Sequence, residues 1–362
     1  MSQTTTSTVP PASAAQAPPA NLPPITIHTG SSLLLRILCG LGWIGCFVFL
    51  TLFLGLSIGL REYFDRSGGI REKYHSGAMH ARDKVAVITV DGAILKGSGF
   101  VKHQIDRVRD DKNVKAIVVR VNSPGGTITG SDYIHHHLVK LRQEKKVPMV
   151  VSMGGIAASG GYYLAMAVGD QQRTIYAEPT TTTGSIGVIV PHYDLSGLLT
   201  HFNVKDDSIV SHPRKQLMAM TKPISDEDRK ILQVYVDDAF TRFKDIIKGG
   251  RPVFRQTPEK LDDLATGEIF SARQAKDHGL IDELGFVEDA IDRAMELAEL
   301  HKDRTRVVEY EQPPSLFDLP FVSDAEARPS ALALILDLNT PQAYYLATTL
   351  PPLVTQQSGV QP

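Results

Sequence analysis

The chain has 362 residues, a formal net charge of −2 and 22% charged residues. This length suits one large domain or two modest ones, and the balanced charge implies no general affinity for nucleic acid. Its two cysteines, Cys39 and Cys46, both lie in an apolar N-terminal segment. The rest of the chain therefore has no thiol for an internal disulfide, a cysteine-ligated zinc ion or a cysteine nucleophile.

The N-terminal part predicts a disordered tail followed by a membrane anchor. Residues 1–32 are rich in Pro, Ser, Thr and Ala, a composition that buries too little apolar surface to offset the entropy of ordering. The 24 residues from Ile37 to Leu60 carry no charge, and about 20 apolar residues span a bilayer as a helix. Because the run is long and lacks a clear cleavage site, we predict a transmembrane helix over 33–60 rather than a signal peptide.

The charges beside this helix bear on its orientation. One basic residue, Arg36, precedes the uncharged run, and four follow it between Arg61 and Lys73. The positive-inside tendency, taken alone, would place the C-terminal part in the cytoplasm. Residues 61–83 are charged and contain glycine, and we expect them to form a stalk.

Residues 84–305 alternate between apolar runs and amphipathic segments. We expect strands at 85–90, 116–121, 148–152, 174–177 and 186–190, and helices at 97–111, 128–141, 225–249, 271–278 and 287–300. This alternation indicates βαβ units, so we predict an α/β fold with a largely parallel sheet. Beyond 305 the pattern decays into short apolar pieces separated by prolines, and we expect 306–362 to be a tail.

Ser159 is the candidate nucleophile. It lies in the small-residue stretch Gly154–Gly161, after a buried strand and before an expected helix. Glycines at such a turn let a substrate backbone come close, and the helix start adds N–H groups that favour negative charge. The alternative is a tight packing turn between a strand and a helix, and this stretch alone does not decide between them.

A second glycine turn, Ser123–Gly126, follows the preceding strand and also leads into an expected helix. In open α/β sheets, ligands bind at the carboxyl ends of the strands. N–H groups converging from this turn and from Gly160 would form an oxyanion hole. A lone Pro-Gly-Gly is usually a plain turn, so the pair of turns is the more specific signal.

A serine nucleophile needs a base. His135, His136 and His137 lie in an expected helix, where three consecutive residues point in different directions, so we expect a solvated helix face rather than a ligand set. The remaining option is a lysine whose pKa is lowered by burial or a nearby cation. Lys215 has the least polar surroundings of the lysines in the 200–260 region, although a lysine in a mixed loop is usually just solvated.

Four segments in unbroken order over 84–300 carry a resemblance to a known family. They are Asn122–Gly126, Ala158–Tyr163, Thr183–Val188 and Gly267–Gly285. The combination resembles the signal peptide peptidase A family, membrane-anchored serine peptidases with a Ser–Lys dyad in the Clp protease/crotonase superfamily. The resemblance implies a Clp protease/crotonase-like ββα superhelix preceded by a single transmembrane helix.

The resemblance also implies roles for residues at matching positions. Ser159 matches the nucleophile, and Gly126 and Gly160 match the oxyanion donors, with Gly125 as the alternative to Gly126. Lys215 matches the general base.

Ser185 matches a serine that orients this lysine. The sequence around Lys215, His212-Pro213-Arg214-Lys215, departs from the small-residue context usual in the family. No metal or organic cofactor is implied.

In the resembled family, serine and lysine meet across an interface, and this chain has one copy of each motif. The resemblance therefore implies a homo-oligomer with sites shared between subunits. It also implies short apolar peptides, such as signal peptide remnants, as substrates, and a bacterial inner membrane location. The implied side of the membrane is extracytoplasmic, against the flanking charges. Two alternatives are a crotonase-like acyl-CoA enzyme, which would not need Ser159 or Lys215, and a catalytically silent membrane scaffold.

Overall fold

The computed structural model describes residues 33–64, 69–312 and 344–346, and it separates into two units, Met1–Tyr63 and Phe64–Pro362. In the first unit, helix α1 (Leu33–Phe64) contains the apolar segment Arg36–Ser57, which is long enough to cross a membrane. The large apolar side chains described in this segment are exposed. Such exposure fits a helix whose partner is lipid.

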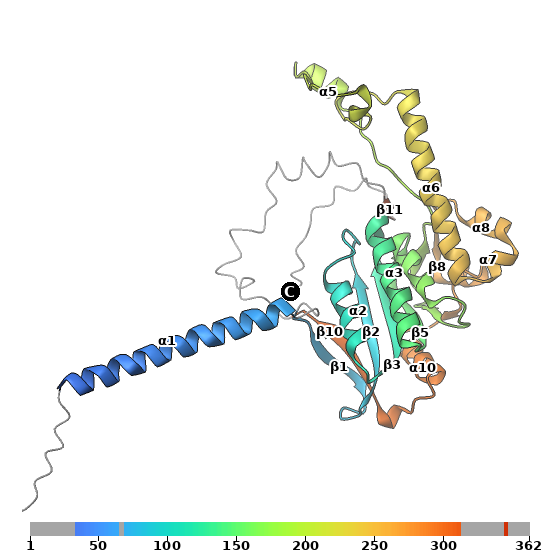
Figure 1. Cartoon of the computed structure of the whole chain (residues 1–362). Coiled ribbons are helices and arrows are strands. Elements are labelled where there is room, and N and C mark those ends of the chain that lie inside the picture. Colours follow the sequence, from blue (N-terminus) through green and yellow to red (C-terminus); the bar gives the residue numbers. More distant parts are fainter. Residues whose placement is uncertain (1–32, 65–68, 313–343, 347–362) are drawn as a thin grey trace, which may run out of the picture. The chain divides into compact units, whose positions relative to one another are not determined.

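The second unit is built around a nine-stranded sheet, and the predicted α/β fold with a mostly parallel sheet is confirmed (Figure 1). Its main path runs β1-β10-β2-β3-β5-β6-β9, with β7 paired to β5 and β8 paired to β7. Only the β1–β10 and β7–β8 pairs of this sheet are antiparallel. A separate two-stranded sheet joins β11 to β4.

The strands of these two sheets are β1 (Arg71–Gly77), β2 (Asp83–Asp91), β3 (Val114–Ser123), β4 (Gly125–Thr127), β5 (Met149–Ala158), β6 (Ile175–Ala177), β7 (Thr182–Gly184), β8 (Ile269–Ser271), β9 (Glu283–Leu284), β10 (Thr305–Glu311) and β11 (Tyr344–Leu346). The helices of this unit are α2 (Phe100–Asp110), α3 (Ile128–Lys145), α4 (Gly160–Ala165), α5 (Ser196–His201), α6 (Asp226–Gly250), α7 (Val253–Gln256), α8 (Pro258–Leu264), α9 (Ala272–Asp277) and α10 (Val287–Leu297). Short 3-10 turns are η1 (Met166–Val168), η2 (Pro213–Gln216) and η3 (Lys302–Arg304).

Both faces of the central strands are buried. Along β2, Ala86 and Ile88 belong to the larger core on the side of α2 and α3, whereas Val85 and Val87 belong to a smaller core covered by α10. Successive side chains of a strand point to opposite faces, so a strand covered on both sides is apolar throughout. This explains the continuous apolar runs in the sequence.

The domain boundaries differ from those expected. Residues 71–77, expected in the stalk, form β1, and residues 306–311, expected at the start of the tail, belong to β10, which lies between β1 and β2. The strand expected at 186–190 is not formed, and the preceding polar turn instead contributes β7. The predicted tails at 1–32, 313–343 and 347–362 lie outside the described residues.

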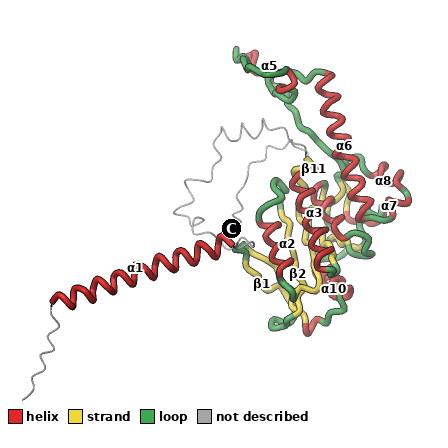
Figure 2. The backbone as a smooth tube through the Cα atoms, in the orientation of Figure 1, coloured by secondary structure: helices red, strands yellow, loops and turns green. Residues whose placement is uncertain are grey.

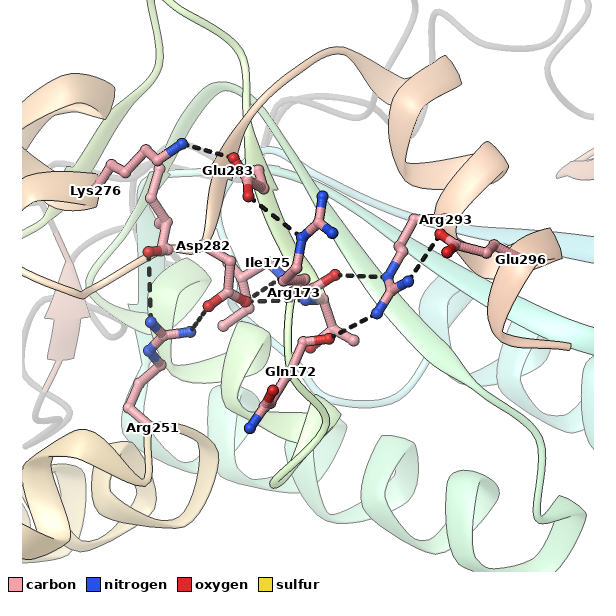
Figure 3. A network of polar contacts seen from close by, with 11 residues as sticks. Gln172, Arg173, Ile175, Arg251, Lys276, Asp282, Glu283, Arg293 and Glu296 are labelled. Carbon is pink, nitrogen blue, oxygen red and sulfur yellow. Dashed lines mark hydrogen bonds and ion pairs between the residues drawn. The ribbon is translucent and has the colours of Figure 1, made fainter.

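The segment Gly279–Gly285 connects several elements through hydrogen bonds and an ion pair (Figure 3). Asp282 accepts the N–H groups of Thr174 and Ile175 at 2.9 Å each, and its other oxygen pairs with Arg251 at 2.7 Å. Tyr162 donates to the Leu280 carbonyl at 2.8 Å. These bonds fix β6 and the start of α4 against the chain after α9, so this motif supports the region around residue 159.

Candidate active site

Ser159 lies at the junction of β5 and α4 with an unusual backbone. Its φ is 53° and its ψ is −115°, and a positive φ is uncommon for a residue with a side chain. The Ser159 N–H donates to the Gly184 carbonyl at 2.8 Å, and its carbonyl accepts from the Tyr163 N–H at 2.8 Å. Strained residues of this kind cluster at functional sites, and a serine on a sharp strand-to-helix turn is a recurring arrangement for nucleophiles.

The glycine turn after β3 packs directly against the start of α4. A Cβ atom on Gly125 would lie 2.5 Å from the Gly160 nitrogen, and one on Gly160 would lie 3.2 Å from the Gly126 nitrogen. Only glycine permits backbones to approach this closely. The Gly125 N–H already donates to Ser123 Oγ at 3.1 Å. Gly126 is therefore the better candidate for an oxyanion donor, and the fold brings it beside Gly160.

Ser185 lies beside Ser159 through strand pairing. β7 is parallel to β5, with Gly184 opposite Ala158, so the next residues along the two strands are neighbours. Ser185 has a φ of 50° and is 8% exposed, and its N–H donates to the Glu268 carbonyl at 2.6 Å. The structure thus brings Ser185 to the same end of the sheet as Ser159.

Lys215 lies elsewhere in the same chain. It is an exposed residue of η2, within an arm (residues 186–225) that connects β7 to α6 and is mostly loop (Figure 2). It lines a cleft with Leu199, Val204 and Met218 of the same arm. Figure 1 shows α5 of this arm beyond the N-terminal end of α6, away from the sheet. Within one chain, Lys215 is not brought to Ser159.

A polar cluster that the sequence did not reveal supports the region behind Ser159. The Tyr163 hydroxyl donates to Asp132 at 2.6 Å, and Arg242 Nε donates to the same oxygen at 3.1 Å. Burial disfavours the charge on Asp132, but these hydrogen bonds outweigh it and lower the pKa of the carboxyl group. The cluster ties α3, α4 and α6 together.

His135 corrects the expectation of a solvated histidine face. It is buried against Tyr163, with ring centroids 5.1 Å apart, and burial lowers its pKa to about 4. His136 is exposed and His137 is partly buried. The burial of His135 could have been predicted from the helical period. One buried face of α3 has the spacing of Ser131, Ile134, His135, Leu138 and Leu141.

Comparison with known proteins places this geometry in a family. The family model for peptidase family S49 matches residues 141–301, a range that contains Ser159, Ser185 and Lys215. "Protease 4" of Salmonella typhi is 35% identical over 246 residues, which cover 65% of this chain and 38% of that protein. This chain thus spans well under half of that relative.

Two relatives are matched over most of their length. A protein of Enterococcus faecium named "Putative signal peptide peptidase SppA" is 36% identical over 247 residues, which cover 65% of this chain and 69% of that protein. A protein of Synechocystis named as a putative protease is 36% identical over 235 residues, which cover 65% of this chain and 82% of that protein. The chain therefore belongs to peptidase family S49, the serine peptidases that include signal peptide peptidase A.

Proposed function

We propose that this chain hydrolyses peptide bonds with Ser159 as nucleophile, Lys215 of a neighbouring subunit as general base, and Gly126 and Gly160 as oxyanion donors. The observation that carries the proposal is the strained Ser159 backbone, which lies where two glycine turns converge. Ser185, the strand neighbour of Ser159, would orient the lysine.

In this mechanism, neutral Lys215 takes the Ser159 hydroxyl proton as Oγ attacks the carbonyl carbon of the scissile bond. The N–H groups of Gly126 and Gly160 stabilise the negative oxygen of the tetrahedral intermediate, and a donor of this kind contributes roughly 3–4 kcal/mol. The lysine then gives its proton to the leaving amine, and water hydrolyses the acyl-enzyme. Lys215 is exposed in a single chain, so burial at a subunit interface would provide the pKa shift that a lysine base requires.

Exposed apolar side chains on the arm that carries Lys215 support an interface there. Phe202 is 66% exposed, Leu198 is 54% exposed and Val204 is 53% exposed. A cluster of exposed apolar side chains on a projecting segment favours association. A second copy of this chain that covers the arm would bury these apolar side chains, and its own Ser159 would receive the lysine that the site lacks.

The dyad is tested by labelling the full chain, purified in detergent, with a fluorophosphonate probe. We expect Ser159→Ala and Lys215→Ala each to abolish labelling. Lys205→Ala serves as the matched control, because Lys205 is another exposed lysine lining the same cleft. Labelling that survives Lys215→Ala would move the base to another residue.

Sharing of sites between subunits is tested by co-expressing the two inactive variants. If Ser159 and Lys215 come from different subunits, random mixing at equal amounts restores about a quarter of wild-type activity, because a quarter of the sites then combine an intact serine with an intact lysine. If both residues come from one subunit, the mixed oligomer stays inactive.

The proposed substrates are short apolar peptides left in the membrane, such as signal peptide remnants. The name of the Enterococcus relative supports this class, and α1 would hold the catalytic unit close to the bilayer. We place that unit on the extracytoplasmic side of a bacterial inner membrane. Alkaline phosphatase fused after Phe64 should then be active and a fluorescent protein that matures only in the cytoplasm should be dark, and the reverse pair of results would overturn this orientation.

A further inference from the structure

The segment that carries Lys215 depends on side chains for its order. Residues 202–212, between α5 and η2, form neither helix nor strand. Within η2, the Lys215 N–H donates to the His212 carbonyl at 2.9 Å. The Leu195 N–H donates to the Met220 carbonyl at 2.8 Å and joins the two limbs of the arm. A loop with so few backbone bonds holds a side chain in one place only when other side chains cross-link it.

Asp206 makes such a cross-link with both of its carboxylate oxygens. Oδ1 accepts from the Ser208 N–H at 3.0 Å and from the Ser208 hydroxyl at 2.5 Å. Oδ2 accepts from the Gln216 side-chain amide at 3.3 Å and from the Thr221 hydroxyl at 2.5 Å. Gln216 follows Lys215 directly in the chain. One oxygen therefore closes the turn at Asp206, and the other holds the segment on the far side of Lys215.

These hydrogen bonds keep the Asp206 carboxylate in its charged form. The bonds from Ser208 and Thr221 outweigh desolvation and lower the pKa of this carboxyl group, and the charge of Lys222 acts in the same direction. An ionised carboxylate accepts about four hydrogen bonds, and the four donors described above fill these positions. A carboxylate paired in this way can be covered by another protein surface without leaving an unpaired acceptor. The cross-link therefore suits an arm that docks on a second subunit.

We propose that Asp206 is a positioning residue for the proposed reaction. Its carboxylate joins the loop before η2 to the chain after it, and so fixes the turn that presents Lys215 to the serine of the neighbouring subunit. Asp206 and Lys215 line the same cleft. The inference rests on the proposed function, because it takes Lys215 as the general base. A base that is held in place beforehand accepts the serine proton without first having to order its own segment.

The positioning role is tested by the rate of fluorophosphonate labelling of the full chain in detergent. Asp206→Ala removes the whole cross-link and should slow labelling about tenfold or more, because a small displacement of a catalytic group is costly. Asp206→Asn keeps the size of the side chain and, with the Gln216 amide turned over, can still bond both segments, so its rate should stay within about threefold of wild type. Asp207→Ala is the matched control and should label at the wild-type rate, because Asp207 is an exposed neighbouring carboxylate that does not line the cleft.

Hydrogen–deuterium exchange measures the order of η2 independently of catalysis. The Lys215 amide is bonded within this turn, so its exchange reports how often the turn opens. Asp206→Ala should speed exchange in a peptide covering 213–221 about threefold or more, and Asp207→Ala should leave it unchanged. Unchanged exchange in Asp206→Ala would overturn the cross-link, whatever the labelling rate.

A pair of inactive chains separates positioning of the base from general folding. In co-expressed oligomers, the Ser159→Ala chain supplies the lysine and the Lys215→Ala chain supplies the serine. Asp206→Ala on the lysine-supplying chain should lower the restored activity about tenfold, whereas on the serine-supplying chain it should have no effect. Equal losses in the two arrangements would show that Asp206 acts on folding or assembly, and would overturn its positioning role.

Two further outcomes separate this inference from the proposed function. Unchanged labelling in Asp206→Ala, in a protein whose Lys215→Ala variant is not labelled, would overturn the role of Asp206 and leave the base in place. Equal slowing by Asp206→Ala and Asp206→Asn would assign the effect to the charge and overturn the hydrogen-bonded cross-link. Full labelling of Lys215→Ala would instead remove the proposed base itself.

Discussion

Because the two glycine turns pack closely, the single methyl group added by Gly160→Ala should be severely disruptive. The new Cβ atom would lie 2.4 Å from Ser131 Oγ, 3.1 Å from the Gly125 Cα and 3.2 Å from the Gly126 nitrogen. Gly160 has no positive φ, so the substitution is unfavourable through crowding and not through backbone strain. All three neighbours are buried, and two of them are backbone atoms that cannot rotate away.

Crowding of this kind in a packed interior costs about 1–3 kcal/mol. For a domain of this size, that corresponds to a fall in the midpoint of thermal unfolding of roughly 2–4 °C per kcal/mol. The catalytic effect is larger, because the displaced backbone moves the two proposed oxyanion donors apart. Loss of one such donor lowers kcat by about 10²–10³-fold. KM should change little, since the donors act mainly in the transition state.

The assay combines thermal unfolding with peptide hydrolysis on the full chain in detergent. The nearest clash is with Ser131, whose buried hydroxyl has no hydrogen-bond partner among the described residues. Ser131→Gly in the Gly160→Ala background should therefore recover most of the lost thermal stability, and Ser131→Ala alone should leave the unfolding midpoint unchanged or higher. If Gly160→Ala keeps both the midpoint and kcat within error of wild type, the close approach of the two turns is wrong.

Two further predictions concern buried polar groups. Burial lowers the pKa of His135 to about 4 in the folded chain, against 6.5 for the free side chain. The unfolded chain therefore binds the proton first, and about 3 kcal/mol of stability is lost as pH falls from 6.5 to 4. His135→Gln should flatten this part of the plot of unfolding free energy against pH, and parallel plots for the two proteins would contradict the burial of His135. Asp282→Asn leaves Arg251, which is 9% exposed, without its carboxylate partner, and should lower the free energy of unfolding by about 3–5 kcal/mol. As a control, Asp245→Asn removes the exposed ion-pair partner of Lys248 and should lower it by less than about 1 kcal/mol.

The sequence predicted the parts of the fold that local chemistry determines. Ser225 caps α6 and Ser271 caps α9, as expected from their positions before helical segments. The edge strand β1 was not predicted because its sequence is polar. Edge strands have one unpaired side and commonly carry charges. β10 and β11 pair with strands far away along the chain, and no local pattern encodes such a partner.

The candidate site residues differ in how much of their placement is local to the sequence. Ser159 and the glycine turns stand out in the sequence because their conformations restrict residue type locally, as the close approach at Gly160 shows. Ser185 required the register of β7 on β5. Lys215 lies on an arm that, under our proposal, packs against another subunit. Its contact with Ser159 therefore cannot be predicted from the sequence pattern and is not formed within one subunit.

Both edges of β4 are paired among the described residues. One edge is bonded to Ile94, and the other pairs with β11 in an antiparallel register that sets Tyr345 opposite Gly126. Gly125→Ala should block this edge, because its Cβ would lie 2.1 Å from the carbonyl of the bound strand.

Backbone strain alone must be separated from this steric effect. Gly125 has a φ of 94°, and Gly267 has a φ of 87° with no atom within 4 Å of a built Cβ. Both alanine variants should therefore lose about 1 kcal/mol of stability from strain, but Gly125→Ala should lose more, because its Cβ would also lie 2.1 Å from the Tyr345 oxygen and 2.5 Å from the Gly160 nitrogen. Equal losses in the two variants, measured by thermal unfolding, would show that β11 does not pair with β4, because the clash at Gly125 leaves no room for a carbonyl on that edge.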